Sequence, residues 1–319
     1  MIVVLDADTL DFDESVWKPF EAFGPVHSYG STPSDDAIIA ERIQGAKIVF
    51  TNKVPLGQTV IECSPDLQFI GVLATGYNII DLDAANRAGI AVCNVPAYSG
   101  SSVAQHTLAL ILELCHQVGL HNRSVQSGDW VRSPLFTYWK SPLIELKGRT
   151  VGFLGFGDIA RRVAELCHLM GASIIAHTPS RRNAPNWERF FWVDQERLFA
   201  DSDILSLHCP QTPKTTKIIS DETLALMKPT AFLINTARGG LIDEAKLAKA
   251  LREGTIAGAA LDVVSVEPMQ ADNPLLGAPH CIITPHLAWS SLESRQRLME
   301  ISLENLQSWQ AGNRLNRVD

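Results

Sequence analysis

The chain has 319 residues, of which 46% are hydrophobic, and 27 Lys or Arg against 35 Asp or Glu give a net charge of −8. At about 150 residues per domain this length predicts two domains. The hydrophobic fraction is enough to bury a large core, so it excludes disorder as the dominant state. The acidic balance disfavours a nucleic-acid partner, because phosphate binding needs a concentrated basic surface. No apolar run reaches the roughly 18 residues of a membrane span. The N-terminal segment Met1–Asp6 lacks a basic region and has an acidic residue at position 6, which is typical of a first strand and not of a signal peptide.

Six cysteines are spread singly along the chain, with no Cys-x-x-Cys pair among them. This spacing is typical of reduced thiols in a cytoplasmic protein, and it indicates neither a disulfide framework nor a metal site.

Short apolar runs alternate with helix-like segments, which predicts an α/β fold with doubly wound parallel sheets. One predicted helix, from about 101 to 118, has an apolar centre at 108–112 and should be buried on more than one side. The stretch 127–142, rich in Pro, Trp and Ser, is expected to be irregular. The other expected helices are 34–45, 81–89, 159–170 and 291–312; the expected strands are 2–5, 48–51, 69–73, 90–95, 150–154, 173–177, 204–208, 231–235, 257–263 and 281–284.

A G-x-G-x-x-A motif, from Gly155 through Gly157 to Ala160, joins the strand at 150–154 to the following helix. The first glycine permits a tight turn, the second lets backbone N–H groups approach a pyrophosphate, and the small alanine allows close packing. The helix N-terminus then faces the phosphates, so the segment predicts dinucleotide binding.

The end of the next strand predicts which dinucleotide is bound. An acidic residue about 20 positions after the motif holds the ribose hydroxyls of NAD, but this chain has Thr178 there, followed by Ser180, Arg181 and Arg182. Without the carboxylate, a serine and arginines can bind a 2′-phosphate. The cofactor is therefore expected to be NAD(H) or NADP(H), with NADP(H) favoured.

Three more segments follow strands of the second series, and they contain Arg238, Glu267 and His286. Because the carboxyl ends of parallel strands meet at one edge of a sheet, the three side chains are expected to converge. An imidazole suits proton transfer to a carbonyl, a carboxylate fixes its tautomer, and an arginine clamps a substrate carboxylate. The set therefore predicts reduction of a 2-oxo acid.

These segments resemble the D-isomer-specific 2-hydroxyacid dehydrogenases over nearly the whole chain, from about 47 to 312. The motifs that carry the resemblance are Gly71–Asn78, Ser102–His106, Gly152–Ala160, His208–Pro210, Ile234–Leu241, Leu261–Pro268 and Thr284–Ala288. The segments 94–96, 142–146 and 272–276, with Trp139, are most similar to the glycerate dehydrogenase, or hydroxypyruvate reductase, branch.

The resemblance implies a discontinuous layout with an active-site cleft between two domains. A flavodoxin-like substrate domain would combine residues 1–97 and 290–319, and a Rossmann cofactor domain would span 98–289. Arg238 would bind the substrate, Glu267 would orient the imidazole of His286, and His286 would act as acid and base. Ala74, Thr75 and Gly76 would offer backbone groups to the substrate carboxylate. The implied cofactor contacts are Gly155, Phe156, Gly157, Asp158, Ile159, Thr178, Ser180, Arg181, His208, Cys209, Pro210, Thr215, Thr236, Ala237, Arg238, Asp262, His286 and Ala288.

The resemblance also implies a homodimer through the cofactor domains. Leu135, Phe136 or Trp139 would then reach the partner's active site, or the loop that carries them would pack on its own subunit. Two alternatives stay open: a dinucleotide-sensing regulatory protein of the same fold, and a dehydrogenase for another small acid such as formate or phosphite. Glu267 argues against formate, because formate enzymes of this family typically have glutamine at this position. Gln105 stands where many relatives have glutamate, a change expected to alter hydrogen bonds between domains more than the chemistry.

Overall fold

The computed structural model describes residues 1–10 and 12–319, and the chain divides into two compact units. Unit 1 combines Met1–Ser99 with Ser290–Asp319, and unit 2 is Gly100–Trp289. Each unit is built around one parallel sheet, so the predicted fold class of two parallel-sheet α/β domains is confirmed.

Unit 1 contains a five-stranded sheet with the strand order β2-β1-β3-β4-β5, which is the flavodoxin-like order. Its strands are short and apolar, and all residues of β1, β3, β4 and β5 are buried, as expected for a parallel sheet covered on both faces. The elements are β1 (Ile2–Val4), 3-10 helices at Ala7–Leu10 and Glu14–Phe23, β2 (Val26–Ser28), α1 (Asp36–Arg42), β3 (Ile48–Thr51), α2 (Gln58–Glu62), β4 (Phe69–Val72), α3 (Leu82–Arg87), β5 (Ala91–Cys93) and α11 (Leu292–Gln310).

Unit 2 contains a seven-stranded sheet with the order β12-β11-β10-β9-β6-β7-β8. After β6 the chain adds β7 and β8 on one side of that strand and then β9 to β12 on the other. The strand order therefore reverses between β6 and β9, as in dinucleotide-binding sheets, and ligands bind at such a switch point. The elements are α4 (Gly100–His116), α5 (Val118–Gln126), α6 (Asp129–Arg132), β6 (Thr150–Leu154), α7 (Asp158–Leu169), β7 (Ser173–His177), β8 (Phe190–Trp192), α8 (Gln195–Asp201), β9 (Ile204–Leu207), α9 (Asp221–Leu226), β10 (Phe232–Asn235), a 3-10 helix at Gly239–Leu241, α10 (Glu244–Glu253), β11 (Gly258–Leu261) and β12 (Cys281–Ile283).

The long helix between the two predicted strand series differs from the expectation. It ends at His116, because Gln117 takes a left-handed conformation with φ +45°, and α5 then starts at Val118. One side of α4 packs on α7, β10 and β11, whereas Leu108, Ala109 and Leu112 are half-buried or exposed. The chain therefore buries only one side of this apolar helix.

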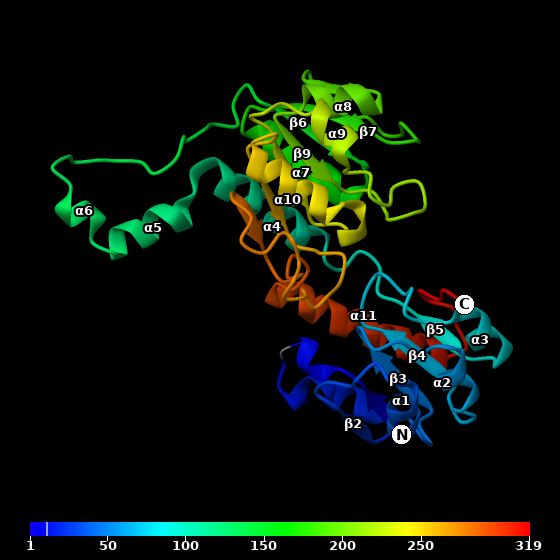
Figure 1. Ribbon diagram of the computed structural model, residues 1–319. Helices are drawn as coiled ribbons and strands as arrows, with labels where there is room; N and C mark the ends of the chain where they lie inside the picture. Colours follow the sequence, from blue (N-terminus) through cyan, green and yellow to red (C-terminus); the bar gives the residue numbers. More distant parts are fainter. Residues whose placement is uncertain (11) are drawn as a thin grey trace. The chain divides into compact units, whose positions relative to one another are not determined.

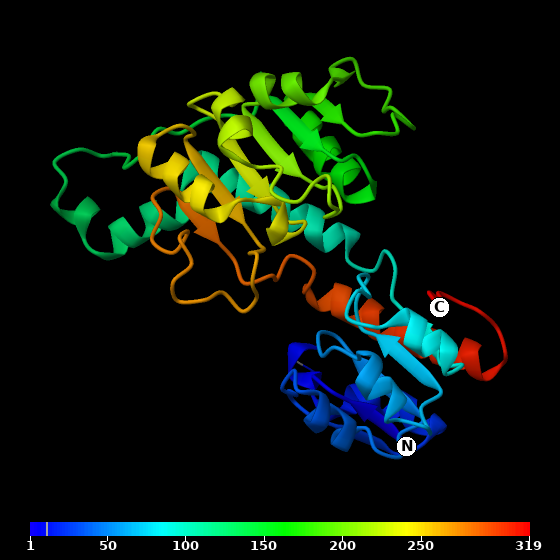
Figure 2. The ribbon, with the colours of Figure 1, turned by 45° about the vertical axis from the view of Figure 1, so that its right-hand side comes forward.

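The predicted irregular stretch 127–142 contains one short helix, α6. Together with α5 it forms an arm that extends away from the sheet of unit 2 (Figures 1 and 2). Its apolar side chains are strongly exposed: Val131 89%, Phe136 87%, Trp139 68% and Leu135 64%.

Candidate active site

The glycine loop after β6 adopts the geometry that its sequence predicts. Gly155 has φ +87°, and a Cβ there would lie 2.7 Å from the backbone of His208 and Cys209. Only glycine fits this position. A Cβ on Gly157, which precedes α7, would have no neighbouring atom within 4 Å, so the space before the helix N-terminus is open. This cradle fits a pyrophosphate bound by backbone N–H groups.

The segment after β9 lies against this loop, at the switch point of the sheet. The Nε2 atom of His208 and the Ser206 hydroxyl share a hydrogen bond at 2.8 Å. Burial lowers the pKa of His208 to about 4. The imidazole is therefore neutral at physiological pH. The Thr215 hydroxyl donates to the carbonyl oxygen of Pro210 at 2.7 Å and closes the loop that follows.

The segment after β7 presents exposed polar groups beside the N-terminal part of α7. Ser180 and Arg181 are exposed, and Thr178 is half-buried. Arg161 of α7 donates to the carbonyl oxygen of Arg182 at 2.8 Å and so holds this segment next to the glycine loop.

His286 and Glu267 are in direct contact at the carboxyl edge of the same sheet. His286 follows β12 and Glu267 follows β11, and these two strands are paired in register. The Nδ1 atom of His286 lies 2.6 Å from Oε2 of Glu267, while Oε1 of Glu267 accepts a hydrogen bond from the backbone N–H of Val264 at 3.2 Å. Because Nδ1 is hydrogen-bonded to the carboxylate, Nε2 is the ring nitrogen that can exchange a proton with a substrate.

Arg238 follows β10, the strand next to β11. The side chain of Asn235 holds its turn: it donates to the carbonyl oxygen of Arg238 at 2.9 Å and accepts from the N–H of Ala237 at 3.0 Å. A Cβ on Gly239 would lie 2.0 Å from the carbonyl of Val264, so this turn packs directly on the segment that carries Glu267. Arg238 is exposed at this edge, and its guanidinium donates a hydrogen bond to the carbonyl oxygen of Ala237 at 2.6 Å.

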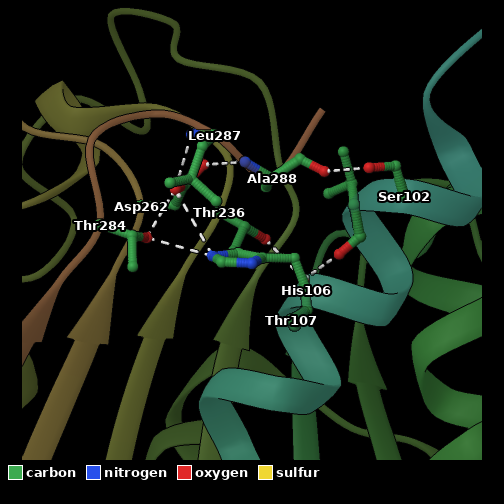
Figure 3. Close-up of polar contacts among 9 residues, drawn as sticks. Ser102, His106, Thr107, Thr236, Asp262, Thr284, Leu287 and Ala288 are labelled. Carbon is green, nitrogen blue, oxygen red and sulfur yellow. Dashed lines mark hydrogen bonds and ion pairs between the residues drawn. The ribbon is translucent and has the colours of Figure 1, made fainter. Parts of the chain in front are cut away.

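The buried carboxylate of Asp262, only 1% exposed, anchors the loop that carries His286 (Figure 3). Its Oδ1 accepts hydrogen bonds from the Thr284 hydroxyl at 2.6 Å and the N–H of Leu287 at 2.9 Å, and its Oδ2 accepts from the N–H of Ala288 at 2.9 Å. The N–H of His286 itself donates to the carbonyl oxygen of Asp262 at 2.8 Å. His286 has φ +52°, and these bonds stabilise that conformation.

Helix α4 holds the same loop from the other side (Figure 3). The Thr284 hydroxyl hydrogen goes to Asp262, so His106 Nε2, 3.1 Å from that oxygen, is the donor of their hydrogen bond. The hydroxyl of Ser102 donates a hydrogen bond to the carbonyl oxygen of Ala288 at 2.6 Å. The hydroxyls of Thr107 in α4 and of Thr236, which follows β10, share a hydrogen bond at 2.9 Å. The resemblance implies that Asp262 contacts the cofactor, but the sequence does not predict this network, because its members come from three distant segments.

Thr284→Val is expected to loosen this loop. The variant keeps the side-chain shape but removes the hydroxyl that joins Asp262 and His106, leaving buried polar groups with fewer partners at a cost of about 1–3 kcal/mol. We expect a lower free energy of unfolding and a fall in kcat of about tenfold, measured by denaturant titration and initial rates. Thr230→Val, at an exposed position, is the matched control. An unchanged kcat in Thr284→Val would show that the network does not position His286.

The predicted substrate loop lies in unit 1. Ala74, Thr75 and Gly76 follow β4, and the Thr75 hydroxyl donates to the carbonyl oxygen of Val95 at 2.9 Å. The side chain of Asn94 donates to the carbonyl oxygen of Thr75 at 2.7 Å. Both contacts turn the polar groups of Thr75 toward the protein and fix the loop backbone at the carboxyl edge of this sheet.

Within the described ranges 1–10 and 12–319, no group of three or more His, Cys, Asp or Glu is placed to hold a metal ion. In the same part of the chain, no helix combines the length and apolar character of a membrane span.

Comparison with known proteins identifies the family. Residues 108–288 match the model of the D-isomer specific 2-hydroxyacid dehydrogenase NAD-binding domain. The chain belongs to this family. It is therefore an oxidoreductase that acts on 2-hydroxy acids with a nicotinamide cofactor.

Relatives in the family match over the full length. The chain is 42% identical to a hydroxypyruvate reductase of Blautia hydrogenotrophica, covering 100% of this chain and 99% of that protein. It is 37% identical to a glycerate dehydrogenase of Methylorubrum extorquens, covering 100% and 98%. Among solved structures, the NADPH-dependent glyoxylate/hydroxypyruvate reductase of Sinorhizobium meliloti superposes with a TM-score of 0.85 at 28% identity, covering 99% of this chain and 97% of that one.

Proposed function

We propose that this dehydrogenase reduces hydroxypyruvate, and glyoxylate as a second substrate, to the 2-hydroxy acid, giving D-glycerate from hydroxypyruvate, and catalyses the reverse oxidation. The observation that carries the proposal is the 2.6 Å contact between His286 and Glu267 at the sheet edge that also holds Arg238 and the glycine loop. The two full-length relatives named for hydroxypyruvate and glycerate support this substrate.

The chemistry follows from the roles of three side chains. A bound nicotinamide cofactor supplies the hydride in the reductive direction. Arg238 binds the substrate carboxylate and polarises the carbonyl, because its planar fork matches two oxygens. His286 donates a proton from Nε2 to the carbonyl oxygen and takes it back in the oxidation, and Glu267 stabilises the imidazolium. The backbone of Ala74, Thr75 and Gly76 is proposed to bind the substrate carboxylate as well.

The residues proposed to hold the cofactor follow β6, β7, β9, β10, β11 and β12 at the carboxyl edge of the unit 2 sheet. The cradle at Gly157 fits the pyrophosphate, and the segment from His208 to Pro210 fits the adenosine. Asp262 contacts the nicotinamide end of the cofactor with its carboxylate, and the loop that it anchors carries His286. The further contacts are Gly155, Phe156, Asp158, Ile159, Thr178, Ser180, Arg181, Thr215, Thr236, Ala237, Arg238, His286 and Ala288.

NADP(H) is the proposed preferred cofactor. Thr178 stands where a ribose-binding acid would repel a 2′-phosphate, and the exposed Ser180 and Arg181 can bind one. Arg181→Ala is expected to raise the KM for NADPH about tenfold and to leave the KM for NADH unchanged. Steady-state kinetics with both cofactors tests this, with the exposed Arg189→Ala as control. Equal effects on the two cofactors would contradict the preference.

We propose a homodimer through the cofactor-binding units. The unburied side of α4 and the apolar arm around α5 and α6 support it, since such surfaces mark interfaces between proteins. Phe136, Leu135 or Trp139 would then reach the partner's active site.

Analytical ultracentrifugation of the wild type should give the mass of two chains. The double variant Phe136→Ser/Val131→Ser should shift the measured mass toward that of one chain. A monomeric wild type would refute the dimer.

A cytoplasmic location stays a prediction from the six cysteines, all of which are free thiols.

The proposed substrate is tested by initial rates with hydroxypyruvate, glyoxylate and pyruvate, each with NADH and NADPH. We expect the highest kcat/KM for hydroxypyruvate. Failure to reduce any of the three, with measurable cofactor binding, would favour a different small acid.

A further inference from the structure

Glu267 lies in an exposed part of the long loop between β11 and β12. The stretch from Ser265 to Pro268 is exposed throughout. Within this loop, the backbone N–H of Val264 donates to Oε1 of Glu267, while Oε2 contacts His286. An exposed segment outside helices and strands keeps its shape where hydrogen bonds or packing fix it. The position of the Glu267 carboxylate therefore depends on how the loop is anchored.

Glu244, the first residue of α10, anchors the loop on both sides of Glu267. Its Oε1 accepts a hydrogen bond from the backbone N–H of Ser265 at 2.6 Å, and its Oε2 accepts one from the Ser265 hydroxyl at 2.8 Å. Oε2 also accepts from the side-chain amide of Asn273 at 2.9 Å. A carboxylate can accept several hydrogen bonds through its two oxygens, so one side chain holds two parts of the loop.

The more distant of these two parts is itself fixed in the core. The side-chain oxygen of Asn273 accepts from the backbone N–H of Leu275 at 3.0 Å, and Leu275 is buried. Leu275 belongs to the same apolar core as Leu247 and Leu251 of α10. The hydrogen bonds from Ser265 to Glu244 therefore tie the exposed part of the loop to a packed helix.

The loop also contacts the turn that precedes α10. A Cβ on Gly239 would lie 2.0 Å from the carbonyl of Val264 and 2.5 Å from the backbone nitrogen of Ser265. This backbone contact opposes movement of the loop toward the turn. The three hydrogen bonds to Glu244 oppose its movement away from α10, so the two contacts together fix the segment that leads to Glu267.

We propose that Glu244 is a positioning residue that holds Glu267 within hydrogen-bonding distance of His286. The inference rests on the proposed function, in which Glu267 stabilises the imidazolium of His286. A hydrogen bond to a charged group is strong but weakens steeply as the two groups separate or lose alignment. Without Glu244, the loop loses its tether to α10, and the Glu267 carboxylate contacts Nδ1 of His286 in a smaller fraction of molecules.

A double-mutant cycle tests this inference. Glu244→Ala removes the three hydrogen bonds and should lower kcat for hydroxypyruvate about tenfold, with the KM for the cofactor unchanged. In an enzyme that already carries Glu267→Gln, the same substitution should lower kcat by less than about twofold, because the charge that Glu244 positions is absent. Glu244→Gln keeps one acceptor oxygen and should retain more of kcat than Glu244→Ala.

Glu253→Ala is the matched control and should leave kcat unchanged. Glu253 is the last residue of the same helix and is exposed. Denaturant titration shows whether each variant is folded under the assay conditions. If Glu244→Ala is not folded, the same cycle is measured with Glu244→Gln, for which a smaller fall in kcat is expected in the wild-type background and none in Glu267→Gln.

Two results would overturn the inference while the wild type remains active. An unchanged kcat in Glu244→Ala would show that Glu267 does not need this tether. An equal fall in kcat with and without Glu267→Gln would show that Glu244 acts independently of Glu267. A wild type that reduces none of hydroxypyruvate, glyoxylate and pyruvate would instead overturn the proposed function, and this inference with it.

Discussion

His286→Gln is expected to lower kcat for hydroxypyruvate reduction by about 10²- to 10⁴-fold, the usual contribution of a positioned general acid. Glutamine can still form hydrogen bonds but cannot deliver a proton to the carbonyl oxygen. The contact between Nδ1 and Glu267 at 2.6 Å leaves Nε2 as the only ring position for that transfer. Stopped-flow or steady-state measurements of cofactor oxidation give kcat, and cofactor fluorescence shows whether binding persists.

Two variants complete this prediction. Glu267→Gln should reduce kcat less than His286→Gln, because the amide can still accept from the N–H of Val264 and contact the ring but carries no charge to stabilise the imidazolium. His280→Gln, at an exposed position on the turn before β12, should leave kcat unchanged. If His286→Gln kept more than about a tenth of the wild-type kcat, a loss too small for a general acid, His286 would not be the acid.

Arg238→Met is expected to lower kcat/KM for hydroxypyruvate by about 10²- to 10³-fold, the loss seen when a donor to a developing oxyanion is removed. Both KM and kcat should change, because the role proposed for the guanidinium is to bind the carboxylate in the ground state and to polarise the carbonyl in the transition state. Arg238→Lys should recover only part of the loss, since an ammonium lacks the planar fork.

The control for Arg238 is Arg252→Met. Arg252 is an exposed arginine of α10 that donates to the carbonyl oxygen of Pro274, and its loss should leave kcat/KM unchanged. An Arg238→Met enzyme with unchanged KM for all 2-oxo acids would remove Arg238 from the substrate site.

The strands of unit 2 could be predicted from sequence because each is a short apolar run beside a turn signal. The predicted strands 150–154 and 173–177 coincide with β6 and β7. Each of the other predicted strands of unit 2 differs from the observed strand by one to three residues, counted over both of its ends. The order of strands in each sheet depends on contacts between distant segments, so only the structure shows where the switch point of the unit 2 sheet lies.

Other elements were missed for identifiable reasons. β8 (Phe190–Trp192) has no alternating pattern and lies in a stretch rich in Arg, Asn and Pro, which favours a loop. The 3-10 helix Glu14–Phe23 contains Pro19, yet it buries Trp17 and Phe20 against the sheet of unit 1. Tertiary packing, not local pattern, stabilises both elements.

In the candidate site, too, some features follow from the local sequence pattern and others depend on contacts between distant segments. The contact between His286 and Glu267 was predicted, because the ends of neighbouring parallel strands must meet at one edge. The anchoring role of Asp262 was not predicted. Two of its partners are the backbone N–H groups of Leu287 and Ala288, which every residue type but proline offers, and its side-chain partner Thr284 is 22 positions away along the chain. A buried carboxylate that accepts several such bonds therefore has no sequence signature.

The central claim is that this chain reduces a 2-oxo acid to the D-hydroxy acid. The measurement that tests it most directly is chiral analysis of the product after the wild-type protein is incubated with hydroxypyruvate and NADPH. The account predicts that D-glycerate forms in step with cofactor oxidation. Formation of L-glycerate, or no product from an enzyme that binds the cofactor, would contradict it.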